Sequence, residues 1–262
     1  MAGHVWNAGM FPLIHREITV FTLKRYQRYG DLPAAFLSAY PEEELDAYVN
    51  TYLKEEILAE GLIRCLPPFS RFLKTIALAN GEMINFTKLA NDCQVPLSTV
   101  TEYVGLLEDT LIGFLLPART ESKKRKAIKT SKYYFFDPGV THMLTGTKTL
   151  DCNSNLYGKS FVQFICMELR AYLSYNRKRL PLTYWRSKNG HEVDFLLGTR
   201  TAIEVKASKK VSGNNFKGLK YLNEERVFQK LFSQDPVSTL TDNILTIHWQ
   251  KFLTDLWKNR FV

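Results

Sequence analysis

Several features that often reveal a protein's function are missing from this sequence. Its four cysteines lie far apart and form no Cys-x-x-Cys pair, which argues against a zinc site and fits reduced thiols. The N-terminus has no basic segment followed by an apolar one, and no apolar run reaches the roughly 18 residues that a membrane helix needs. We therefore expect a soluble, cytoplasmic protein without a membrane partner.

A complete phosphate-binding loop is also missing. Gly158-Lys159-Ser160 looks like the end of such a loop, but Asn153 occupies the position of its first glycine. No apolar strand precedes the segment either, because residues 150–156 are largely polar. We therefore expect no ATP site in this chain.

Positive charge, by contrast, is abundant. Of the 262 residues, 35 are Lys or Arg and 26 are Asp or Glu, which gives a formal net charge of +9. Such a balance favours an anionic partner such as nucleic acid, although it does not identify one. The hydrophobic content of 45% is enough for one large core or two to three small ones.

Residues 1–75 have the pattern of a helical region. Pro41 and the three glutamates after it are typical of a helix start, where acidic side chains suit the helix dipole. Pro68 predicts the start of another helix, with Phe69 and Phe72 on its apolar stripe. No catalytic pattern is visible in this region.

Residues 76–148 have the pattern of a winged helix. Helices are expected at 86–94 and 99–109, with Ser98 as the N-cap of the second. Strands are expected at 111–116 and 132–136, on either side of a long loop.

That loop is strongly basic and predicts a DNA-binding wing. Phosphate contacts from such a wing give an affinity that depends on salt and not on sequence. The helix at 99–109, however, contains no Arg or Lys, so a solvated loop in a protein-interaction module is the alternative. The candidate nucleic-acid-binding residues are Arg119, Lys123, Lys124, Arg125, Lys126 and Lys129.

Residues 149–262 contain the candidate catalytic residues. Apolar runs at 193–197 and 202–205 flank a polar turn with Gly198, which predicts a β-hairpin. Because side chains alternate along a strand, a three-residue turn places Asp194 across from Glu204, and Glu204 on the same face as Lys206. A slip of one residue would separate the two carboxylates.

Asp194, Glu204 and Lys206 form the candidate catalytic site. Carboxylate oxygens bind Mg²⁺ or Mn²⁺, and the metal activates water for attack on a phosphodiester. Lys206 could position the water or stabilise developing charge. The alternative is a cross-strand ion pair on a solvated sheet face.

Glu168 is a possible third metal ligand. It interrupts the apolar stripe of a helix expected at 161–175, and a carboxylate that points inward needs a partner or a metal. The alternative is that Glu168 sits at the edge of the stripe and reaches solvent.

Longer motifs resemble a known family. They occupy residues 52–57, 66–73, 106–114, 134–140, 190–197 and 202–208. Together they resemble the region that follows the nucleotide-binding module in prokaryotic AAA-type ATPases, a domain of unknown function of the DUF4143 type. The resemblance implies a fold like that of the PD-(D/E)XK nucleases, in which helices flank a mixed sheet.

The resemblance also implies roles for single residues. Asp194, Glu204 and Lys206 match the family's Asp and Glu-x-Lys, whereas Val162 replaces a helical glutamate and cannot bind a metal. An ATPase module normally precedes this region, so we expect a natural truncation or half of a split ATPase. A separate ATPase subunit, or self-association, would complete it.

We therefore expect an α/β (α+β) protein with three parts: a helical region (1–75), a winged helix (76–148) and a restriction-endonuclease-like domain (149–262). The expected function is DNA binding, with a nuclease-like domain that is non-catalytic or weakly catalytic. The alternative is a Mg²⁺- or Mn²⁺-dependent DNA phosphodiesterase that uses Asp194, Glu204 and Lys206.

Overall fold

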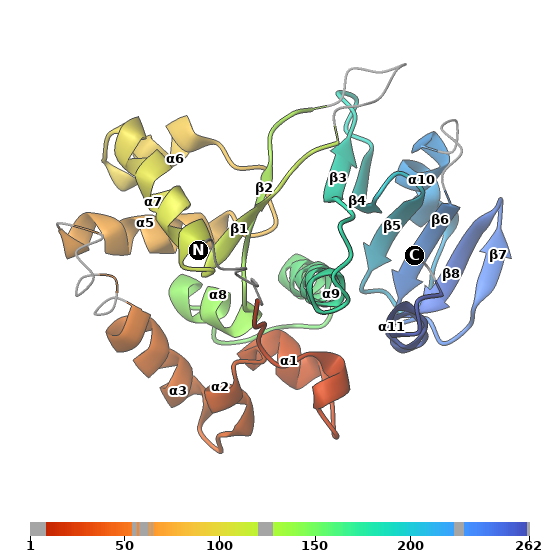
Figure 1. The fold of residues 1–262 in the computed structure, drawn as a ribbon, viewed down its shortest axis with the longest axis horizontal. Helices are drawn as coiled ribbons and strands as arrows, with labels where there is room; N and C mark the ends of the chain where they lie inside the picture. The colour runs from red at the N-terminus through yellow and green to blue at the C-terminus, as the bar shows by residue number, and fades with distance from the viewer. Residues whose placement is uncertain are drawn as a thin grey trace, which may run out of the picture.

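The computed structural model describes residues 9–53, 57, 63, 65–119, 128–222 and 228–260. Helices dominate the N-terminal part and a six-stranded mixed sheet dominates the C-terminal part, with the long helix α9 between them (Figure 1). This confirms the expected mixed α/β class at that level. No described helix is both long enough and apolar enough to cross a membrane.

The N-terminal part is helical, as predicted. Pro41 begins α3 and three glutamates fill its first turn, while α5 begins at Leu66, two residues before the predicted Pro68. Phe69 and Phe72 of α5 are fully buried. The elements are η1 (His15–Glu17), α1 (Leu23–Tyr29), α2 (Pro33–Leu37), α3 (Pro41–Ala47), the π-helical η2 (Tyr48–Tyr52) and α5 (Leu66–Leu78).

Two helices and a two-stranded sheet follow in the predicted order. They are α6 (Phe86–Cys93), α7 (Leu97–Asp109), β1 (Gly113–Leu116) and β2 (Lys132–Phe135), and β1 pairs antiparallel with β2. The prediction that Ser98 caps the second helix is wrong, because α7 begins at Leu97, two residues before the expected start at Thr99. Pro96 already has the extended backbone of an N-cap residue (φ −57°, ψ 151°), so Ser98 lies inside the first turn.

One of the family-like motifs, residues 134–140, meets the end of α1 at the start of α8 (Pro138–Thr145). Asp137 caps this helix: its Oδ1 accepts a hydrogen bond from the backbone N of Val140 at 2.9 Å, and its Oδ2 accepts one from that of Asp31 at 2.8 Å. Gly30 has a φ of +71°, and a Cβ there would lie 2.1 Å from the Asp137 carboxylate. Glycine is therefore required at this junction between α1 and α8.

The C-terminal sheet has the strand order β3-β4-β5-β6-β8-β7. Strands β5, β6 and β8 are parallel neighbours, whereas β3–β4, β4–β5 and β7–β8 are antiparallel. The strands are β3 (Leu182–Arg186), β4 (Glu192–Leu197), β5 (Thr201–Lys206), β6 (Phe228–Ser233), β7 (Thr239–Thr241) and β8 (Ile244–His248).

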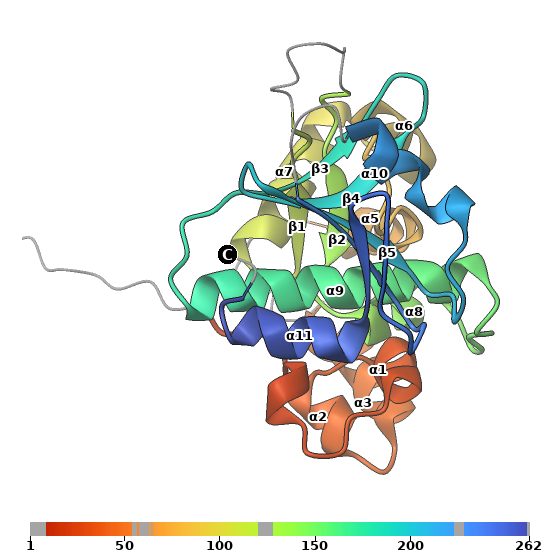
Figure 2. The same ribbon diagram turned by 90° about the vertical axis from the view of Figure 1, so that its right-hand side faces the viewer.

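Helices cover both faces of this sheet. On one face lie α9 (Asn155–Tyr175) and α11 (Trp249–Trp257), which run side by side in Figure 2. The short η3 (Gly213–Phe216) and α10 (Lys217–Leu222) lie on the other. Phe195, Ile203 and Val205 belong to the core on the α9 side, whereas Val193 and Leu196 pack in a separate cluster on the α10 side.

The described ends of the loop between β1 and β2 lie along the edge strand β3. At its first end, Tyr184 N donates to Pro117 O at 3.0 Å and Arg119 N donates to Tyr184 O at 2.7 Å. At its second end, Ile128 N donates to Arg186 O at 3.0 Å. Both described ends of the basic loop are thus fastened to the C-terminal sheet.

Candidate functional site

A β-bulge in the predicted hairpin decides where Asp194 lies. The three-residue turn is as predicted, because Leu197 pairs with Thr201. On the other edge of β4, Leu196 pairs with Thr183 but Val193 pairs with Trp185, so two residues of β4 oppose one of β3. Regular pairing of β4 with β5 ends at Phe195 and Ile203, one step before the expected Asp194–Glu204 pair.

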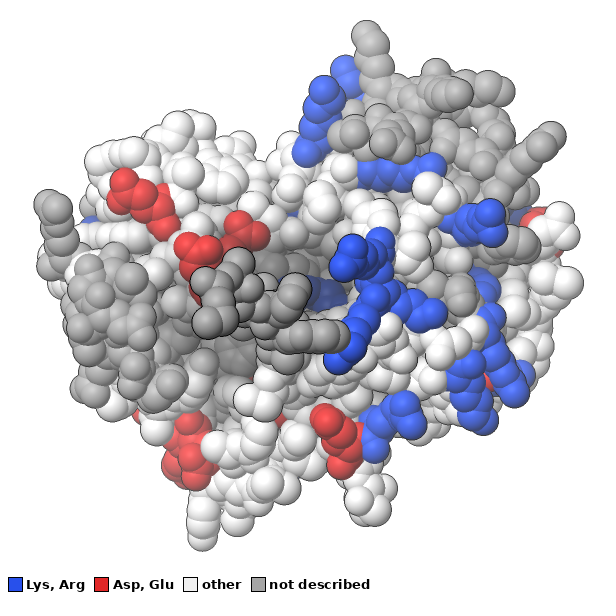
Figure 3. Space-filling view, viewed as in Figure 1, with Lys and Arg blue, Asp and Glu red and all other residues white. Residues whose placement is uncertain are grey.

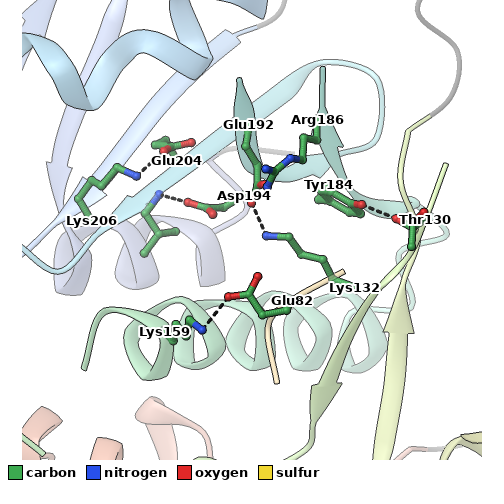
Figure 4. Close-up of polar contacts among 11 residues, drawn as sticks. Glu82, Thr130, Lys132, Lys159, Tyr184, Arg186, Glu192, Asp194, Glu204 and Lys206 are labelled. Carbon is green, nitrogen blue, oxygen red and sulfur yellow. Dashed lines mark hydrogen bonds and ion pairs between the residues drawn. The ribbon is translucent and has the colours of Figure 1, made fainter. Parts of the chain in front are cut away.

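Asp194 instead binds the backbone of β5. Its Oδ2 accepts a hydrogen bond from Val205 N at 2.9 Å, as Figure 4 shows. Asp194 and Lys206 both line a cavity on the α9 side, but Glu204 does not. The three predicted residues therefore lie close together. The carboxylates of Asp194 and Glu204, however, do not face the same cavity.

Glu204 is buried in an environment that resists its ionisation. Burial raises its pKa to about 8 and the charge of Asp194 adds to the rise, while Lys206 opposes it. Glu204 Oε1 lies 2.5 Å from Lys206 Nζ, and Oε2 has no hydrogen-bond partner among the described residues. Burial favours a lower pKa for Lys206, but the charges of Glu204 and Asp194 raise that pKa overall.

The cavity beside Asp194 has a volume of about 300 Å³. We call it the polar cavity, because seven charged side chains line it. They come from the segment before α6, from β2, from the start of α9 and from β3, β4 and the end of β5. The cations are Lys132, Lys159, Arg186 and Lys206, and the acids are Glu82, Glu192 and Asp194.

Ion pairs connect these charges (Figure 4). Glu192 contacts both Lys132 and Arg186, the latter at 2.6 Å, and Lys159 lies 2.6 Å from Glu82. Burial favours a higher pKa for Glu192, but its two cationic partners lower that pKa overall. Lys159, Arg186 and Lys206 keep about a third of their side-chain surface exposed, so an outside anion can reach them.

The third expected metal ligand is not in the polar cavity. Val162 lines it, at the position where the resemblance expects a glutamate. Glu168 accepts hydrogen bonds from His15 N at 2.6 Å and Trp257 Nε1 at 3.3 Å, and burial raises its pKa to about 7. The alternative of a solvent-exposed Glu168 is wrong, because the residue is only 2% exposed. Within the described residues, no group of three or more His, Cys, Asp or Glu could hold a metal ion.

Where they are described, the predicted nucleic-acid-binding residues lie next to β3, the strand that carries Arg186 of the cavity. Arg119 is held against β3 by its backbone, and Lys129 is exposed at the other end of the loop. Lys123, Lys124, Arg125 and Lys126 lie outside the described residues.

Sequence reasoning missed three cations of the cavity. Lys132 was visible as the last basic residue of the loop, and Lys159 stands in the Gly-Lys-Ser segment that only resembled a phosphate-binding loop. Arg186 carried no signal, since its role depends on the pairing of β3 with β4.

Two family profiles match the chain. One, described as Domain of unknown function (DUF8612), matches residues 20–151; the other, Domain of unknown function (DUF4143), matches residues 157–250. The chain belongs to the DUF8612 family. The DUF4143 match confirms that part of the expected resemblance.

Two mycobacterial proteins are similar to this DUF8612 chain. They are "Uncharacterized protein Rv2008c" of Mycobacterium tuberculosis and "Uncharacterized protein Mb2031c" of Mycobacterium bovis, each 26% identical over 215 residues. The matched part is 79% of this chain and 48% of each relative, so the chain spans about half the length of these curated relatives. No solved structure matches the chain.

The polar cavity lies where the two matched regions meet. Glu82 and Lys132 belong to the DUF8612 region, whereas Lys159, Arg186 and Asp194 belong to the DUF4143 region. Two ion pairs, Glu82–Lys159 and Lys132–Glu192, cross from one region to the other. The cavity therefore depends on both regions and on how they pack.

Proposed function

We propose that this protein binds duplex DNA, without cleaving it, through a surface that joins the basic loop to the polar cavity. The observation that carries the proposal is a convergence of cations. Lys159, Arg186 and Lys206 open to solvent at the cavity, and the strand that holds Arg186 is hydrogen-bonded to both described ends of the loop.

The distribution of charge supports this surface. In Figure 3, the Lys and Arg side chains in view gather over the centre and right of the molecule, while most of the acids in view lie over its left and lower parts. Cations that track a phosphate backbone provide affinity without sequence preference. A cavity of about 300 Å³ is too small for a duplex, so the backbone would lie across its mouth.

The loop is a better candidate for DNA contact than helix α7. The order α6, α7, β1, β2 is the one expected of a winged helix. However, α7 has no Arg or Lys with which to contact phosphates or guanine. We therefore propose that the protein uses the wing and the adjoining cavity and not a recognition helix in the major groove.

The ligands present do not fit a Mg²⁺ or Mn²⁺ site. Such ions need several ionised oxygen ligands around one point. Glu192 is already neutralised by two cations, Val162 offers no oxygen, and burial favours the protonated form of Glu204. This donor set supports the non-catalytic version of the proposed DNA-binding function.

A metal-dependent phosphodiesterase is the second candidate. Asp194 and Lys206 line the same cavity, and one oxygen of Glu204 lacks a partner among the described residues, which is what favours it. A metal that binds only the folded state raises stability by RT ln(1 + [L]/Kd). We expect millimolar Mn²⁺ to leave the melting temperature unchanged. A rise that Asp194→Asn abolishes would favour the phosphodiesterase instead.

The binding proposal is tested by titrating a labelled duplex at several salt concentrations. Lys159→Ala and Arg186→Ala should each lower the slope of log K against log salt by about 0.9, which corresponds to one lost phosphate contact. Replacing Lys123, Lys124, Arg125 and Lys126 together should lower it by up to about 3 to 4.

Lys220→Ala is the matched control for the cavity variants. Lys220 also pairs with a carboxylate, that of Asp242 at 2.7 Å, but it lies on α10, across the sheet from the cavity. The salt slope of Lys220→Ala should equal that of the native protein. If the cavity variants also keep the native slope, the DNA surface lies elsewhere. Association with an ATPase subunit, or with a second copy, is a separate proposal from the resemblance alone.

A further inference from the structure

The second half of α9 borders another cavity, of about 480 Å³. We call it the apolar cavity, because most of its walls are hydrocarbon. They come from the N-terminal segment, the start of α2, η2, the turn before β1, the residue after β2, and α9. Representative residues are Phe11, Leu111, Ile112, Phe136 and Met167. This volume lies within the roughly 300–1,000 Å³ typical of small-molecule sites.

One cation, Arg170, lines this apolar cavity. Its guanidinium lies over the ring of Phe114, 3.6 Å from the centroid, and 5.6 Å from that of Phe11. It makes no hydrogen bond or ion pair with the part of the chain that the structure describes. The charge of Glu108 favours a higher pKa for Arg170, but no hydrogen bond joins the two side chains. Glu108 Oε1 instead accepts a hydrogen bond from Leu115 N at 2.9 Å.

An Arg in this position is costly without an anion. Burial lowers the pKa of Arg170, which reflects poor solvation of the charge. Arg170 is only partly buried, and stacking on aromatic rings does not satisfy the five N–H donors of its guanidinium. A ligand group that accepts hydrogen bonds and carries negative charge would satisfy these donors.

We propose that the apolar cavity binds a small apolar carboxylic acid whose carboxylate pairs with Arg170. A carboxylate matches the forked donors of guanidinium in a bidentate pair. Ser174, one turn along α9, also lines the cavity and offers a hydroxyl beside that position. The hydrocarbon part would lie against Met167, Ile112 and Phe136 and would gain from burial. This site is independent of the proposed DNA surface.

The proposal is tested by calorimetric titration of the purified protein with decanoate, and with decanol as the neutral analogue of equal chain length. We expect decanoate to bind at least tenfold more tightly than decanol. Arg170→Gln should weaken decanoate binding by about 10- to 100-fold, the usual range for a charge-assisted hydrogen-bonded pair, and leave decanol unchanged. Equal affinity of the native protein for both compounds, or no binding of either, overturns the proposal.

A second variant avoids any effect of Arg170 on folding. Leu111 is 64% exposed at the rim of the cavity, so Leu111→Glu should fold normally and repel an incoming carboxylate. Leu78→Glu is its matched control, because Leu78 is 71% exposed on α5 and does not line the cavity. We expect Leu111→Glu to lose most decanoate binding and Leu78→Glu to keep it. Native affinity in Leu111→Glu would place the acid outside this cavity and overturn the assignment.

Discussion

Helix α9 borders two cavities that differ in whether their cations are paired with carboxylates. Near its start, the four cations of the polar cavity each contact a carboxylate. Near its end, Arg170 of the apolar cavity contacts aromatic rings and no carboxylate of the described residues. Charge in the first cavity is balanced by the fold, so a bound phosphate must compete with internal ion pairs. Charge in the second has no such internal partner among the described residues, so a bound anion would not have to compete for it.

The largest expected effect comes from breaking the balance in the polar cavity. Glu192→Ala leaves Lys132, only 5% exposed, without its carboxylate. Removing one member of a buried pair costs roughly 3–5 kcal/mol, and we expect about 3 kcal/mol here because Glu192 is partly exposed. Urea unfolding at neutral pH measures the loss.

Arg170→Met is the matched comparison for Glu192→Ala. Removing Arg170 leaves no described carboxylate without its cation. We therefore expect the free energy of unfolding to stay within about 1 kcal/mol of the native value. Equal losses in the two variants would show that the two cavities do not differ in charge balance.

Local patterns in the sequence predicted much of this architecture. The alternation in residues 193–205 and Gly198 gave the hairpin with its three-residue turn, and the apolar periodicity gave α7 and the core face of α9. These features depend on neighbours along the chain, which is why local reasoning found them.

The details of the site could not be predicted in the same way. The bulge at Asp194 arises from pairing with β3. The alternation of residues along the hairpin itself gives no information about that pairing. Lys132, Lys159 and Arg186 meet only because α9, β2 and β3 pack together. The partners of Glu168, His15 and Trp257, come from the opposite ends of the chain. Its burial therefore could not be predicted from the local sequence either.

A smaller effect should follow from pH at Glu204, which lies behind the polar cavity. Its folded-state pKa is raised to about 8, above the ordinary value of 4.5, by burial and by Asp194, against the opposing charge of Lys206. A raised pKa means that stability is present at low pH and is lost as pH rises through about 4.5 to 8. We expect this group to account for a loss on the order of a few kcal/mol across that window.

Glu204→Gln isolates this contribution, because glutamine does not titrate. Glu168, with a pKa raised to about 7 by burial, titrates in the same window and steepens the native curve. The quantity to compare is therefore the difference between native and Glu204→Gln unfolding free energies at pH 5, 6, 7 and 8. A difference that stays constant with pH would mean that Glu204 is ionised throughout and is available as a metal ligand.

The smallest expected change in stability, but an informative one, concerns Glu82. Its pair with Lys159 is half-exposed, and such pairs contribute only about 0–1 kcal/mol. Glu82→Gln should therefore shift the unfolding free energy by less than about 0.5 kcal/mol, yet it frees Lys159 for a phosphate. We expect DNA affinity at low salt to rise a few-fold, because Glu82 no longer competes for Lys159, and the salt slope to keep its native value, because Lys159 contributes one phosphate contact in both proteins. Asp242→Asn, which frees Lys220 on the other side of the sheet, should leave the affinity unchanged. If Glu82→Gln also leaves it unchanged, internal pairing is not what limits the cations of the polar cavity, and the contrast with Arg170 concerns stability alone.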